Sequence, residues 1–128
     1  MVEKSEILSL EDIKRMVNLF YGKVRKDDLL GGIFNEVIQD NWPAHLEKMY
    51  RFWQTVLLEE HTYNGSPFAP HVKLPVQGKH FDRWKQLFFD TVNENFSGDK
   101  AEEAKFRATK MAEMFQLKID YFQNQKRN

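Results

Sequence analysis

Apolar residues recur along most of the chain with the three- and four-residue spacing of helices that bury one face. The first stripe begins after Ser9, whose hydroxyl suits a helix N-cap. It consists of Ile13, Met16, Val17, Phe20 and Val24. A second helix is expected to begin near Pro43, because proline is well tolerated in the first helical turn. Its stripe consists of His45, Met49, Phe52, Trp53 and Val56.

The positions between the apolar residues of the second stripe are polar, and we expect them to face water. They include Glu47, Lys48, Arg51 and Gln54. Between the first two helices, Asp27-Asp28 predicts a short turn that ends at Gly31-Gly32.

Proline and glycine break the helical pattern between His61 and Gly78, where a long regular helix is not expected. Helical spacing then returns in two further stripes, which Ser97-Gly98-Asp99 separates. The third consists of Phe81, Trp84, Leu87, Phe88, Thr91 and Val92. The fourth consists of Ala108, Met111, Ala112, Phe115, Ile119 and Phe122. The pattern predicts a single all-α domain over residues 1–128, with an irregular segment between two pairs of long helices.

Charge and composition exclude several classes of function. The 19 basic residues balance the 19 acidic ones, so we expect neither a nucleic-acid partner nor a membrane partner. The chain has no cysteine, which excludes disulfides, thiolate catalysis and cysteine-based zinc sites. The charged amino terminus lacks the apolar segment of a secretory signal, and no apolar run approaches the roughly 20 residues that span a bilayer. We therefore expect a cytoplasmic protein.

Common catalytic and nucleotide-binding motifs are missing from the sequence. It has no phosphate-binding loop, no dinucleotide fingerprint and no nucleophile elbow. No two histidines lie four residues apart, so a histidine-carboxylate zinc site is unsupported. The apolar residues are unusually aromatic, with 11 Phe, 4 Tyr and 3 Trp. That favours either a core of large flat side chains or a pocket that encloses a flat molecule.

Single residues leave alternatives open. His71 lies among prolines, so it is either an exposed loop histidine or an axial haem ligand held by a stiff backbone. His45 shares the apolar stripe of the second helix, where a half-buried histidine can simply bond at the edge of a groove. Tyr21 and Trp84 suit an ordinary core, although each keeps a polar atom that seeks a partner when buried.

Seven segments occur in a characteristic order between about Ser9 and about Phe122. They are Phe20-Tyr21-Gly22-Lys23-Val24-Arg25, Gly32-Ile33-Phe34-Asn35, Trp42-Pro43-Ala44-His45, Phe52-Trp53, Tyr63-Asn64-Gly65-Ser66-Pro67, His71-Val72-Lys73-Leu74-Pro75 and Phe81-Asp82-Arg83-Trp84. Together they resemble a truncated haemoglobin, most closely group III, a class found in bacteria. The resemblance implies a globin-like two-over-two helical sandwich that encloses haem b.

The same resemblance implies a role for each matching residue. His71 matches the proximal iron ligand, and Tyr21 and Trp84 match the polar groups of the distal pocket. His45 matches the distal histidine of this group, which is expected to gate the pocket, and Phe34 matches the phenylalanine that packs on the porphyrin. Further haem or pocket contacts are expected from Phe20, Met49, Phe52 and Trp53, with Lys48 near a propionate. No residue is expected to act as a catalytic group.

The implied function is reversible binding of dioxygen and of other small ligands such as nitric oxide, carbon monoxide and cyanide. Two distal hydrogen-bond donors predict tight oxygen binding, which favours ligand chemistry or detoxification over bulk oxygen transport. Dioxygenase-like or peroxidase-like turnover would need an external reductase, and the protein is expected to be a monomer. Two other possibilities remain: a haem-free helical interaction or sensor module, and a haem sensor whose output domain belongs to another protein.

Overall fold

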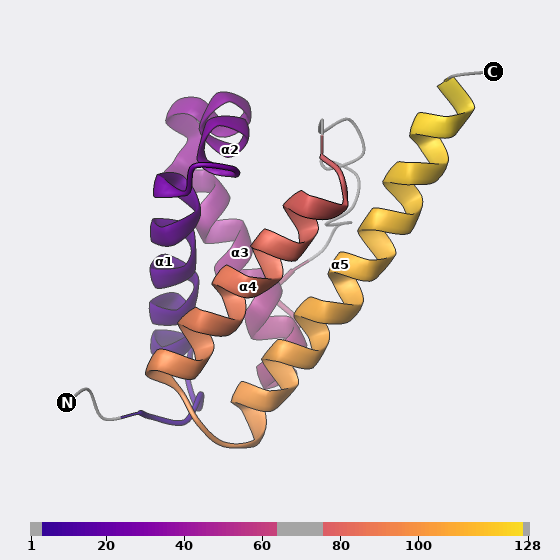
Figure 1. The fold of residues 1–128 in the computed structure, drawn as a ribbon. Helices are drawn as coiled ribbons and strands as arrows, with labels where there is room; N and C mark the ends of the chain where they lie inside the picture. The colour runs from indigo at the N-terminus through magenta and orange to yellow at the C-terminus, as the bar shows by residue number, and fades with distance from the viewer. Residues whose placement is uncertain (1–3, 64–75, 127–128) are drawn as a thin grey trace.

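The helices expected from the sequence are present, together with one that the sequence did not predict. The computed structural model describes residues 4–63 and 76–126. Its elements are α1 (Leu10–Lys26), α2 (Gly31–Ile38), the 3-10 turn η1 (Gln39–Asn41), α3 (Trp42–Leu58), α4 (Gly78–Asn95) and α5 (Asp99–Lys126). Figure 1 shows these elements in order along the chain. The unpredicted helix is α2, where the sequence indicated only a turn.

The four long helices form two packed pairs. Helix α1 packs against α3, α4 packs against α5, and α1 also packs on α4, which joins the pairs (Figure 1). This arrangement confirms the predicted two-over-two helical sandwich. In the part of the chain that the structure describes, no helix is long and apolar enough to cross a membrane.

Helix α1 buries the stripe that the sequence predicted. Its buried residues are Ile13, Met16, Val17, Phe20, Tyr21 and Val24. The predicted start is also confirmed, because the Asp12 carboxylate accepts hydrogen bonds from the backbone N–H groups of Leu8 and Ser9. This cap satisfies amide groups that have no partner within the helix.

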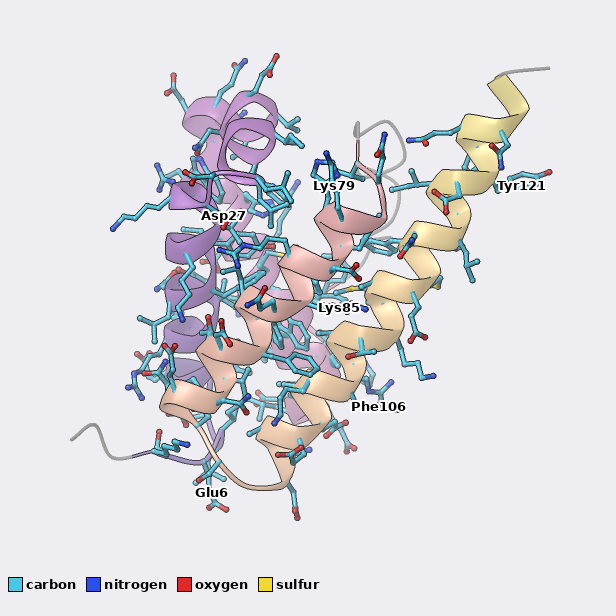
Figure 2. The ribbon with its side chains drawn as sticks, in the orientation of Figure 1. Glu6, Asp27, Lys79, Lys85, Phe106 and Tyr121 are labelled. Atoms are coloured by element: carbon cyan, nitrogen blue, oxygen red, sulfur yellow. The ribbon has the colours of Figure 1, made fainter. Side chains whose placement is uncertain are left out.

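The carboxylate of Asp27, which is labelled in Figure 2, connects the corner between α1 and α2 to α4. Its Oδ1 lies 2.7 Å from both Nε and Nη2 of Arg83. Its Oδ2 accepts bonds of 3.1 Å from the backbone N–H groups of Leu29 and Leu30. Burial acts to raise the pKa of Asp27, but Arg83 and these two N–H groups outweigh it, so the net pKa lies below the ordinary value. An ionised carboxylate therefore holds the start of α2 against α4 near neutral pH.

Gln54 contradicts the expectation that it faces water, because only 5% of it is exposed. Its Oε1 accepts a 2.8 Å bond from the Thr62 hydroxyl, and its Nε2 lies 3.2 Å from Oε2 of Glu60. The side chain therefore pairs with the segment that follows α3. The sequence pattern could not indicate this, because the partners lie outside the helix.

At Gly31, the first residue of α2, the backbone lies close against the end of α1. A Cβ atom at Gly31 would lie 2.8 Å from the backbone oxygen of Arg25, whereas a Cβ at Gly32 would meet nothing within 4 Å. Gly31 therefore leaves no room for a methyl side chain, whereas the adjacent Gly32 does.

We predict that Gly31→Ala lowers the free energy of unfolding by about 1–3 kcal/mol, because α2 must move away from α1 to relieve the contact. Gly32→Ala is the matched control, and it should raise stability by up to about 1 kcal/mol because alanine favours the helix. Urea unfolding followed by circular dichroism measures both variants. Equal effects at the two positions would show that the close approach to Arg25 does not limit this corner.

Candidate functional site

A cavity lies between the helices and has an almost entirely apolar wall. The described residues that line it are Tyr21, Leu30, Phe34, Met49, Phe52, Val76, His80, Phe81, Trp84, Met111, Ala112, Phe115 and Ile119. Among these, only Tyr21, His80 and Trp84 carry side-chain nitrogen or oxygen atoms. All five α-helices contribute to the wall, so the cavity depends on the complete fold.

Tyr21 lies on the buried face of α1, at the centre of an aromatic group. Its ring centroid is 4.9 Å from that of Phe20, 5.8 Å from Trp42 and 5.1 Å from His45, in edge-to-face arrangements. Burial raises the pKa of Tyr21 well above its ordinary value. The phenol therefore stays protonated at physiological pH and keeps a hydroxyl that can donate a hydrogen bond.

Trp84 reaches the same cavity from α4. Its ring stacks on Phe88 at 5.8 Å with an angle of 9° between the planes, and it meets the edge of Phe20 at 5.4 Å. Since Phe20 contacts Tyr21 as well, one phenylalanine packs against both polar aromatic residues. The indole Nε1–H is a donor only, so Trp84 can donate to a ligand and cannot accept from one.

Of the remaining predicted residues that the structure describes, three line the cavity and four do not. Phe34, Met49 and Phe52 line the cavity, as Tyr21 and Trp84 do. The other predicted residues of α1 and α3 are not among the described lining residues: Phe20, His45, Lys48 and Trp53.

These four residues differ in where they lie. Phe20 and Trp53 are buried behind the wall, where each packs on Phe88 at 5.2 Å. His45 is half-buried and packs edge-on against Tyr21 and Trp42. Lys48 is exposed on α3.

His71 lies outside the described residues, but the chain on both sides of it reaches the cavity region. Tyr63 packs edge-on against the lining residue Phe52 at 5.5 Å, and its backbone N–H donates to the Thr55 hydroxyl. Val76 lines the cavity, and its carbonyl oxygen lies 3.4 Å from Nε2 of Gln123.

His80 is a lining residue that the sequence reasoning missed. It lies in the first turn of α4 and is 9% exposed, and its Nδ1 accepts a 2.9 Å bond from the backbone N–H of Gln77. Burial, and after it the charge of Lys79, lowers the pKa of His80 below its ordinary value. Because Nδ1 accepts a hydrogen bond it carries no proton, so the imidazole is neutral and its proton lies on Nε2. One feature of the sequence could have indicated this position: His80 follows Gln77, a possible N-cap of the helix, by three residues.

The wall fits a flat and largely apolar cofactor such as haem. Aromatic and aliphatic side chains supply most of the surface, and three separate polar groups are available for orientation. The described residues contain no group of three or more His, Cys, Asp or Glu that could hold a metal ion. A haem iron needs no such group, because the porphyrin supplies four ligands and the protein one or two.

Comparison with known proteins agrees with this fit. The chain matches the family described as bacterial-like globin over residues 6–119. It is 36% identical over 117 residues to a group 3 truncated haemoglobin of Campylobacter jejuni. The alignment covers 88% of this chain and 92% of the relative.

The fold gives the same result. The crystal structure of a group III truncated haemoglobin from Campylobacter jejuni matches with a TM-score of 0.82 at 35% identity, over 91% of this chain and 95% of that one. Sequence and fold therefore agree over nearly the whole chain, including the helices that build the cavity. The chain belongs to the group III truncated haemoglobins, and it is a haem-binding globin.

Proposed function

We propose that this protein holds haem b through His71 and binds dioxygen tightly beside Tyr21 and Trp84. The observation that carries the proposal is that these two donors come from different helices and line one apolar cavity. When bound, the haem supplies an iron that binds small ligands and shifts electron density onto dioxygen. The protein would supply the hydrogen bonds, the apolar wall and His71 as the residue that holds the iron.

The assignment of His71 rests on the family match and on the other three histidines. His80 uses its Nδ1 lone pair for the Gln77 N–H, so its Nε2 carries a proton and has no lone pair for iron. His61 is exposed and lines a different, polar hollow with Glu103 and Arg107. His45 packs against Tyr21, on the side of the proposed distal group.

Chain length also permits the assignment of His71. It precedes the lining residue Val76 by five positions, and five residues span at most about 18 Å. The axial ligand of this proposal is thus within reach of the cavity that Val76 lines.

Tyr21 and Trp84 act as neutral donors in this proposal. Each charge-assisted hydrogen bond contributes roughly 1.5–3 kcal/mol, and about 1.4 kcal/mol corresponds to a tenfold change in affinity. Two donors therefore raise the affinity for dioxygen by roughly two to four powers of ten, mainly through slow release. Carbon monoxide accepts less electron density, so it gains less from the same groups.

The surrounding residues position these donors and control access. Phe34 supplies a flat apolar surface for the porphyrin, and Met49 and Phe52 complete that part of the wall. His45 acts as a gate, because it packs against Tyr21 without being among the described lining residues. Phe20 and Trp53 support the wall from behind, and Lys48 remains a candidate partner for a haem propionate.

Tight binding suits chemistry on the ligand better than oxygen delivery. A protein that holds dioxygen firmly can present it to nitric oxide or promote peroxide cleavage, and both uses need electrons from an external reductase. We therefore propose detoxification of reactive nitrogen or oxygen species, by a cytoplasmic monomer. Rapid mixing of the oxygenated protein with nitric oxide separates this use from simple storage.

We predict that His71→Gly removes the Soret band of protein produced with haem available, because the iron loses its axial ligand. Added imidazole should restore the band by entering the space that the side chain leaves. His61→Gly is the matched control, since His61 is exposed and lies at another site, and it should keep the band. A normal spectrum for His71→Gly would assign the ligand to a different residue.

We also predict that Tyr21→Phe increases the oxygen dissociation rate by about 10- to 100-fold, because a charge-assisted hydrogen bond is lost. The ring and its packing on Phe20 remain, so the free energy of unfolding should change little. Stopped-flow replacement of oxygen by carbon monoxide measures the rate. An unchanged rate would exclude Tyr21 as a donor to the ligand.

A further inference from the structure

His80 is a polar group in the apolar wall that the oxygen-binding site does not use. It lies in the first turn of α4, and it is nine-tenths buried. Its Nδ1 accepts the Gln77 N–H, and its Nε2 has no hydrogen-bond partner among the residues that the structure describes. A hydrogen-bond donor in an otherwise apolar cavity wall contributes free energy to binding when a ligand accepts its hydrogen bond.

The hydrogen bond to Nδ1 determines what kind of ligand group His80 can meet. A neutral imidazole that accepts at Nδ1 must donate at Nε2, so the cavity side of the ring requires an acceptor. The side chain therefore cannot receive a hydrogen bond from a ligand, and it does not suit a cation.

The surroundings of His80 favour an acceptor that carries negative charge. The first turn of α4 holds no acidic residue, and the N-terminus of a helix attracts anions. Lys79 is the adjacent residue and is exposed at the start of α4, as Figure 2 shows. Asp82, the nearest acidic residue along the helix, lies 3.7 Å from Nζ of Lys85.

We propose that Nε2–H of His80 donates a hydrogen bond to a carboxylate of the haem, and that Lys79 adds positive charge beside it. The inference rests on the proposed binding of haem b, whose two propionates are the anionic groups of that cofactor. It gives the start of α4 a second role, because the residue that caps the helix also orients the cofactor.

Two substitutions separate these two roles of His80. Asn has an oxygen near the position of Nδ1, so His80→Asn keeps the acceptor for Gln77 and removes the inward donor. Gln places its amide nitrogen near the position of Nε2, so His80→Gln keeps the donor and loses the cap. His61→Asn is the matched control at an exposed histidine outside this cavity.

The experiment measures the rate of haem loss from the full-length haem-loaded protein to excess apomyoglobin, followed in the Soret band. Each variant is loaded with natural haem or with its dimethyl ester, in which both carboxylates are blocked. With natural haem we expect His80→Asn to lose the cofactor about 10- to 100-fold faster than the parent protein. His80→Gln and His61→Asn should stay near the parent rate. With the ester, whose carbonyl oxygens are neutral and weaker acceptors, the difference between His80→Asn and the parent should become much smaller.

Two outcomes would overturn the proposal. Equal acceleration of His80→Asn with natural haem and with the ester would show that the residue has only a structural role. An ester-sensitive loss in Lys48→Met, with no effect in His80→Asn, would place the carboxylate at α3. Failure of the parent protein to load haem would contradict the proposed function itself, so the two failures are distinguishable.

Discussion

The packing of Phe20 between α1 and α4 is the contact on which the site depends. Its ring meets Tyr21, Trp84 and Phe88 edge-on, at centroid distances of 4.9, 5.4 and 5.2 Å. Aromatic edge-to-face contacts have a preferred geometry, so Phe20 constrains both polar residues at once. Since Tyr21 and Trp84 lie on separate helices, this shared contact helps to fix their relative positions.

The three polar groups that line the cavity, Tyr21, Trp84 and His80, are all neutral hydrogen-bond donors. Burial raises the pKa of Tyr21, and burial together with Lys79 lowers the pKa of His80, whose Nδ1 accepts the Gln77 N–H. Trp84 has no other form. An apolar wall thus contains donors without placing a free charge in it, which would be costly in a low-dielectric interior.

Most of the helices can be predicted from the sequence, because helical periodicity is a local property. The stripe of α1 and the placement of Tyr21 and Trp84 at one site were predicted, the latter through the family resemblance. Helix α2 was missed, because a short segment with two glycines has little helical tendency of its own and depends on Asp27 and tertiary packing. Gln54 and His80 were missed for a related reason, since their partners are set by how the chain turns at helix ends.

The most direct test of the central claim is the oxygen dissociation rate of the double variant Tyr21→Phe/Trp84→Phe, compared with its carbon monoxide dissociation rate. If both residues donate to one bound ligand, oxygen release should accelerate by roughly two to four powers of ten and carbon monoxide release by much less. Equal changes for the two gases would indicate altered access to the cavity. An oxygen rate like that of the parent protein would contradict the account.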